Sequence, residues 1–231
     1  QGTVRDGNNG GSGGGMRTNN TSSTRIQSSS TQLNGELELW KGYGNKGGYN
    51  ISNNNISAGG GGAGEMGYSN YGYQDTTTTS PDTNKFKGRG GDGLSKVTIN
   101  SVTYNFIELF GENYGEKHND EIYFAGGGAG SEANGGSFIC IGGYGGGANS
   151  VSGNNNGNHG TPNTGGGGSG GNNGNVSASG GDGGSGIVIV RYKRNIGTPT
   201  ITTTSKLAQW TYSTFDTGVY YPTGNVGIGT Y

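Results

Sequence analysis

One stretch of the sequence collects side chains of the types that perform acid–base or metal chemistry: Glu112, Glu116, His118, Asp120 and Glu121. A zinc site would need a second nitrogen or sulfur ligand near His118. The other histidine, His159, lies far along the chain in a segment rich in glycine and asparagine. A solvated loop is also favoured over an acid–base site. We therefore expect this stretch to be a solvated connecting loop.

Two further motifs resemble known sites but lack their context. Gly42–Gly47 matches the G-x-G-x-x-G pattern of dinucleotide-binding turns, which require a strand before the turn and a helix after it. Asp92 and Asp182 each follow two glycines and precede a third, a context typical of a turn-forming aspartate. No nucleophile has a recognisable catalytic setting. The sequence therefore predicts no enzyme, no cofactor and no metal site.

Charge and hydropathy exclude other classes of function. The formal net charge is −1 and Arg89 stands in a single Gly-Arg-Gly-Gly, so no basic face for nucleic acid is expected. No run of 18 apolar residues is present, and we expect no membrane span. The one cysteine, Cys140, lies in Phe138–Ile141, where a small buried thiol is expected.

The composition limits what can hold the chain together. Glycine supplies 56 of 231 residues and apolar residues only 26%, against roughly 45–50% in ordinary globular domains. A conventional large core is therefore excluded. Low hydrophobicity favours disorder mainly when the net charge is high, and the net charge of this chain is near zero. Two outcomes remain: a disordered tract between small β pieces, or order built from the backbone.

Runs of consecutive glycine favour the second outcome. They occur at 59–62, 126–128, 145–147 and 165–168. An extended left-handed helix of three residues per turn has no internal hydrogen bonds, so its N–H and C=O groups point outward. A chain of this kind that is surrounded by similar chains needs glycine at nearly every position. The predicted fold class is mostly irregular and β: a polyglycine-II helix sandwich with short β-strands, a C-terminal β segment and little or no α-helix.

Short apolar segments interrupt the glycine tracts. Only Phe106–Phe110 has the apolar spacing of a helical turn. Alternating or β-branched segments predict strands at 36–40, 97–104, 122–124, 138–141, 187–192, 198–204, 207–212 and 219–221. We predict an N-terminal glycine-rich and short-strand region at 1–87, a polyglycine-rich domain at 88–194 and a C-terminal β assembly segment at 195–231.

Two signatures in the second half resemble a known family. The segment from Ala125–Gly130 to Gly186–Tyr192 resembles the glycine-rich domain of phage tail-fibre proteins and of fibre-like proteins of large DNA viruses. Trp210, Tyr220–Tyr221 and Gly224–Thr230 are similar to the segment that precedes the intramolecular chaperone of tail spikes and fibres. The resemblance covers roughly residues 88 to 231. It implies a fibre or adhesin on a virus particle, with polyglycine helices as a rigid scaffold.

The expected function is that of a structural subunit of a viral or extracellular fibre. Its partners would be copies of itself, in a trimer or a head-to-tail filament, joined by backbone packing and strand addition. The alternative is an adhesin tip whose loops between glycine helices recognise a glycan or protein on a host cell surface. An ice-binding protein would need a regular flat face, which the irregular threonine spacing argues against. The expected location is the virion surface or the extracellular space.

The candidate residues for assembly are the apolar and aromatic ones of the last third of the chain. They are Ile187, Val188, Ile189, Val190, Tyr192, Trp210, Tyr220, Tyr221, Val226 and Ile228. Five asparagines open N-x-S/T sequons, which are glycan acceptors when exposed in a glycosylating host. They are Asn19, Asn20, Asn50, Asn55 and Asn175.

Overall fold

The computed structural model describes residues 12–15, 42–50, 55–72, 86–172 and 177–190, together with short strands at 211–212 and 219–220. The chain divides into two compact units, Gln1–Val188 and Ile189–Tyr231. In the second unit, strand β5 (Thr211–Tyr212) pairs antiparallel with β6 (Val219–Tyr220). Two of the predicted strands, at 36–40 and 198–204, lie outside the described residues.

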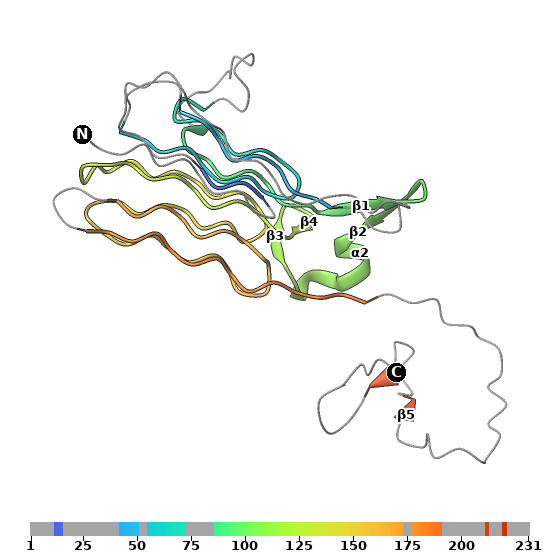
Figure 1. The fold of residues 1–231 in the computed structure, drawn as a ribbon. Helices are drawn as coiled ribbons and strands as arrows, with labels where there is room; N and C mark the ends of the chain where they lie inside the picture. Colours follow the sequence, from blue (N-terminus) through green and yellow to red (C-terminus); the bar gives the residue numbers. More distant parts are fainter. Residues whose placement is uncertain are drawn as a thin grey trace, which may run out of the picture. The chain divides into compact units, whose positions relative to one another are not determined.

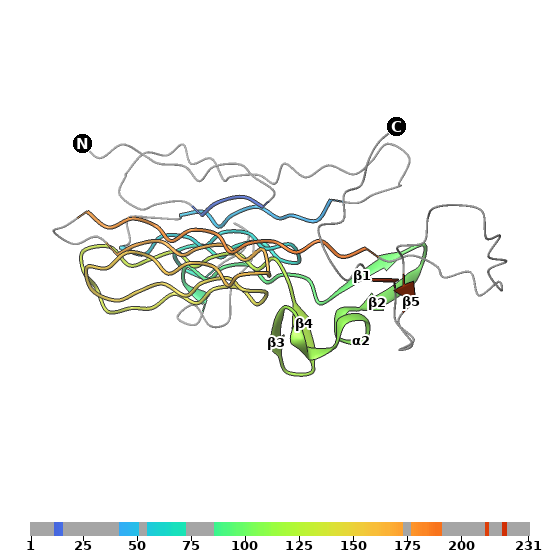
Figure 2. The same ribbon diagram turned by 90° about the horizontal axis from the view of Figure 1, so that it is seen from below.

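The first unit is built mainly from extended runs that lie side by side (Figures 1 and 2). Their backbone hydrogen bonds repeat every third residue. The run 57–63 donates from Ser57, Gly60 and Ala63 to one neighbouring run, at Ser131, Gly128 and Ala125. The intervening Gly59 and Gly62 donate to a second run, and Gly61 donates to a third. Successive residues thus face different neighbours, as in a helix of three residues per turn.

The same three-residue step recurs in both relative directions. Gly127 and Gly130 donate to Gly91 and Gly88 of an antiparallel neighbour. In parallel pairs, Gly90 and Gly93 donate to Ile141 and Tyr144, and Gly167 and Gly170 donate to Gly126 and Ala129. We call the set of hydrogen-bonded extended runs between residues 12 and 186 the glycine lattice. Together with the short strands and the one short helix of the described residues, it confirms the predicted fold class.

Close approach of backbones explains why glycine is required in these runs. A Cβ atom built on Gly90, Gly127 or Gly143 would lie less than 3.0 Å from carbonyl groups of the adjacent run. Side-chain burial contributes little here, since the one cluster of buried apolar side chains in the described residues consists of Ile56, Ala129 and Cys140. Backbone packing is therefore the main source of order in this unit.

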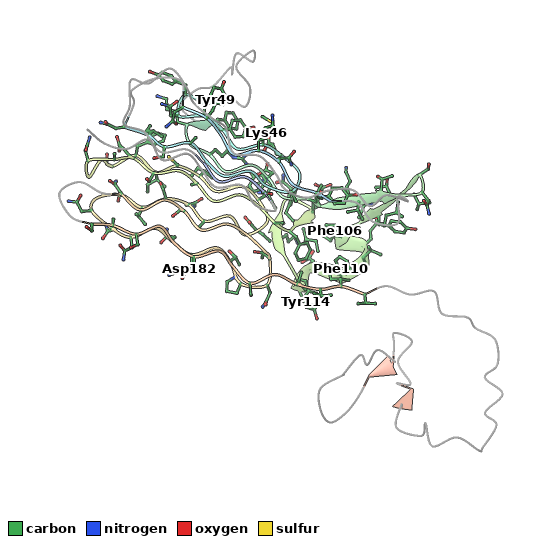
Figure 3. The ribbon with its side chains drawn as sticks, in the orientation of Figure 1. Lys46, Tyr49, Phe106, Phe110, Tyr114 and Asp182 are labelled. Atoms are coloured by element: carbon green, nitrogen blue, oxygen red, sulfur yellow. The ribbon has the colours of Figure 1, made fainter. Side chains whose placement is uncertain are left out.

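Residues 94–124, which we call the insert, carry most of the regular secondary structure (Figure 1). Strand β1 (Lys96–Ile99) pairs with β2 (Val102–Asn105), helix α2 (Phe106–Phe110) and the 3-10 turn η1 (Gly111–Asn113) follow, and β3 (Glu116–His118) pairs with β4 (Glu121–Tyr123). The predicted helical turn is confirmed. Phe106 and Phe110 (Figure 3) pack with Phe124, with ring centroids 5.6 and 6.3 Å from it.

Three strand predictions on the described residues need correction. The segment 97–104 is a hairpin rather than one strand, because Asn100 and Ser101 both take positive φ angles, of 48° and 63°, and form its turn. Phe138–Ile141 is not a strand but part of the glycine lattice, where the carbonyl of Ile141 accepts from Gly90. Residues 187–190 belong to no strand. Within the described residues, no helix is long and apolar enough to cross a bilayer.

Candidate assembly surface

The predicted assembly segment begins with four exposed apolar residues. Val188 and Val190 are 89% and 78% exposed, and Ile187 and Ile189 are also exposed. No described residue donates to or accepts from their backbones. The sequence predicts a strand at 187–192, and the structure shows none at 187–190. The segment is instead extended and open, because the described runs of the glycine lattice end before it.

The other candidate assembly residues follow this segment in the chain, and the structure describes one of them. Tyr220 belongs to β6. The rest lie outside the described residues: Tyr192, Trp210, Tyr221, Val226 and Ile228. Their role in assembly therefore stays a prediction.

The sequons fall in different surroundings. Asn50 is buried, with 4% of its surface exposed, so a glycan on it would not fit the folded chain. Asn55 is exposed, although its side-chain oxygen accepts from the Asn134 amide at 3.2 Å. Asn19, Asn20 and Asn175 lie outside the described residues.

The polar stretch 112–121 is mostly exposed, as the sequence predicts, but it is not a loop. Strands β3 and β4 form a β-hairpin there that contacts the glycine lattice. One carboxylate oxygen of Glu116 accepts from the N–H groups of Gly145 and Gly146, at 2.8 and 2.6 Å. Both glycines are buried and have positive φ angles of 103° and 87°. The ring of His118 stacks on Tyr144 with centroids 3.6 Å apart. Glu116 and His118 therefore fasten the insert to the lattice.

A second polar group lies inside the lattice around Arg89, whose side chain is 8% exposed. Its guanidinium forms ion pairs with the carboxylates of Glu65 and Asp92, with N–O distances of 3.2 and 2.5 Å. It also lies over the ring of Tyr144, 5.2 Å from the centroid. Asp92 accepts in addition from the Tyr144 N–H. The arginine thus joins three runs of the lattice.

The local sequence does not predict this group. Arg89 stands in a single Gly-Arg-Gly-Gly, and the prediction that Asp92 forms a turn is wrong, because Asp92 pairs with Arg89 in an extended run. Burial raises the pKa of the Asp92 carboxyl, although hydrogen bonds from Tyr144 and Arg89 oppose that effect. The available signal was an arginine with an acid three residues later in a chain of few charges. Asp182, in the matching glycine context, is exposed and lies 3.4 Å from His159.

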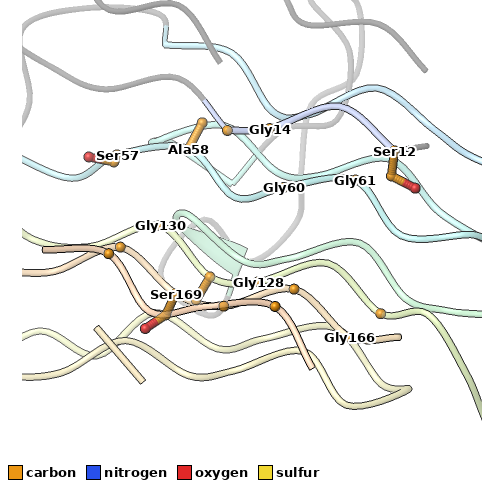
Figure 4. A pocket seen from close by; sticks show the side chains of 18 of the residues that line it. Ser12, Gly14, Ser57, Ala58, Gly60, Gly61, Gly128, Gly130, Gly166 and Ser169 are labelled. Atoms are coloured by element: carbon orange, nitrogen blue, oxygen red, sulfur yellow. The ribbon is translucent and has the colours of Figure 1, made fainter. Parts of the chain in front are cut away.

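An open groove of about 690 Å³ crosses the glycine lattice. Figure 4 shows two sides of the groove. On one side lie Ser12, Gly14, Ser57, Ala58, Gly60 and Gly61, and on the other lie Gly128, Gly130, Gly166 and Ser169. Gly180 and Gly183 also line it. The described lining consists of glycine, alanine and serine, with Tyr43 as its one large side chain. A surface of this kind can offer backbone N–H and C=O groups but holds no catalytic set.

One of three comparisons with known proteins finds a match. No curated protein and no solved structure matches the chain. Residues 1–193 match a family described as a glycine-rich domain. This span includes every run of the glycine lattice and the insert. The chain belongs to the glycine-rich domain family.

Proposed function

We propose that this protein is a structural subunit of a fibre, viral or otherwise extracellular, that assembles with copies of itself. The observation that carries the proposal is a scaffold held by backbone hydrogen bonds whose last described run ends in exposed aliphatic residues. Val188 alone is 89% exposed. Contiguous exposed apolar surface in a soluble chain marks an interaction site.

The extended form of Ile187–Val190 supports strand addition as the joining contact. A strand with free N–H and C=O groups is a template for pairing with another chain. Alternate apolar side chains would then be covered by the added copy. A contact between different surfaces of two copies gives a filament when its rotation does not close into a ring.

Replacing Val188 by Asp tests this proposal without disturbing the lattice, because the side chain is already in solvent. Light scattering and electron microscopy of the wild-type protein should show oligomers or filaments. The Val188→Asp variant should shift toward single chains, and the matched Ile99→Asp variant, at an exposed position of the insert, should assemble normally. Unchanged assembly of Val188→Asp would reject strand addition through this segment.

A second function, that of an adhesin tip, is favoured by the surface of the insert. Ile99, Val102 and Tyr114 are 55%, 50% and 54% exposed. Ile99 and Val102 are the paired strand residues on either side of the hairpin turn, and Tyr114 directly follows η1. Binding of labelled protein to candidate host cells, with Ile99→Asp and Tyr114→Ala compared against Val188→Asp, separates the two functions. Loss of cell binding in the insert variants alone would favour the adhesin.

A further inference from the structure

The groove across the glycine lattice lacks the side chains that hold a small molecule. Its described lining has no charged residue and almost no side chain beyond a methyl or a hydroxymethyl group. Ligand sites normally combine apolar and aromatic walls with a few placed polar groups. Recognition in this groove must therefore use backbone groups, and its occupant must be thin enough to approach them.

Three glycines that line the groove have backbone N–H groups to which the described residues offer no acceptor. In the part of the chain that the structure describes, the N–H groups of Gly168, Gly180 and Gly183 donate to no protein group. Gly180 and Gly183 are exposed and three residues apart. Three residues is also the interval at which lattice runs donate to one neighbour, as Ser57, Gly60 and Ala63 do.

The same two glycines have no packing reason to be glycine within one chain. A Cβ atom on Gly180 or Gly183 would have its nearest neighbour at 3.5 or 3.6 Å, which is ordinary contact. At Gly181 and Gly184, on the same run, a Cβ would instead collide with backbone carbonyls. Glycine at 180 and 183 is explained if another backbone approaches there.

We propose that a glycine-rich run from a second copy of this chain lies in the groove, with its carbonyl groups accepting from Gly168, Gly180 and Gly183. This inference rests on the proposed self-assembly and names its surface. The uncharged groove and a net charge of only −1 let two copies approach without strong repulsion. The run that contains Gly180 and Gly183 continues directly into Ile187 and Val188. One docked copy therefore covers both the groove and exposed apolar residues.

Filling the groove with a side chain tests the proposal. Gly183→Leu places a side chain where a Cβ has room in the single chain, so the fold should be kept. Ser179→Leu adds the same side chain to an exposed position of the same run that does not line the groove. Analytical ultracentrifugation should show a dissociation constant at least about tenfold higher for Gly183→Leu than for wild type, and little change for Ser179→Leu. Calorimetry on dilute samples checks that both variants keep their fold.

Residue-resolved amide exchange at several protein concentrations identifies the occupant. The N–H groups of Gly168, Gly180 and Gly183 should become protected as copies assemble, and this gain should be lost in Gly183→Leu. Protection that is already present and independent of concentration would overturn the proposal, because the chain would then fill its own groove. Amides that stay unprotected in assembled wild-type protein would also overturn it, while the proposed self-assembly would stand. Single chains at every concentration would refute both.

Discussion

Adding one methyl group to the lattice should have opposite effects at two neighbouring glycines. At Gly127, a Cβ atom would lie less than 3.0 Å from the carbonyl groups of Gly60 and Gly61. At Gly60, the nearest atom to a Cβ is the Gly128 oxygen at 3.6 Å. Neither glycine has a positive φ angle. The pair Gly127→Ala and Gly60→Ala therefore separates close packing from backbone conformation.

The size of the difference follows from the contacts. Overpacking costs about 1–3 kcal/mol, and displacing Gly127 weakens its bonds to Gly91 and from Gly143, at 2.8 and 2.9 Å, each contributing roughly 1 kcal/mol. Alanine regains about 0.4–1 kcal/mol by restricting the unfolded chain. The free energy of unfolding of Gly127→Ala should thus be lower than that of wild type by about 2–4 kcal/mol, which corresponds to a fall of roughly 5–15 °C in Tm for a chain of this size. Gly60→Ala should gain about 0.4–1 kcal/mol.

Differential scanning calorimetry of dilute wild type and of the two variants measures both changes. Equal Tm values for Gly127→Ala and wild type would refute the idea that close approach of backbones requires glycine in these runs. A large fall in the Tm of Gly60→Ala would contradict the spacing between the runs 57–63 and 125–131, which leaves room for a Cβ atom at Gly60.

Three further outcomes follow from the polar contacts. Glu116→Ala leaves two buried N–H groups without their acceptor, so calorimetry should show a loss of about 1–3 kcal/mol in the free energy of unfolding, and a smaller loss for Glu116→Gln. Equal Tm values for wild type and both variants would contradict the role of Glu116 in fastening the insert to the lattice. Arg89→Ala removes the cation between the partly buried carboxylates of Glu65 and Asp92. Denaturant unfolding should show a free energy of unfolding lower by about 3 kcal/mol or more, and an unchanged value would show that the ion pairs do not join the runs. Burial raises the pKa of the Cys140 thiol from 9.0 to about 12, so its contribution to the free energy of unfolding is complete below pH 9 and disappears as the pH rises toward 12. A thiol reagent at pH 8 should react with Cys140 only after unfolding, and rapid labelling of the folded chain would refute the burial.

The lattice was predictable from composition because little else can order such a chain. Glycine runs with near-zero net charge left only backbone cohesion or disorder, and the three-residue helix fixed which groups point outward. The helical turn Phe106–Phe110 was predictable from its apolar spacing. The buried state of Cys140, at 1% exposure, followed from its apolar neighbours.

What the sequence could not supply were contacts between runs far apart along the chain. The hydrogen bonds from Gly145 and Gly146 to Glu116 depend on where the insert meets the lattice, and nothing in the local sequence sets that position. The turn at Asn100–Ser101 was missed because the flanking residues read as one continuous strand, and serine is an unusual residue for a positive φ angle. The groove was hidden for another reason: glycines that face an open edge look the same in sequence as glycines that face a neighbour.

Amide exchange in the dilute single chain tests most directly whether backbone hydrogen bonds hold this protein together. The N–H groups of Gly127, Gly143 and Gly167 donate to other runs at 2.8–2.9 Å, whereas those of Gly180 and Gly183 donate to none within the described residues. The first three should exchange at least about a thousandfold more slowly than a random peptide, and the other two should exchange nearly as fast as one. Random-coil exchange at Gly127, Gly143 and Gly167 would contradict the account.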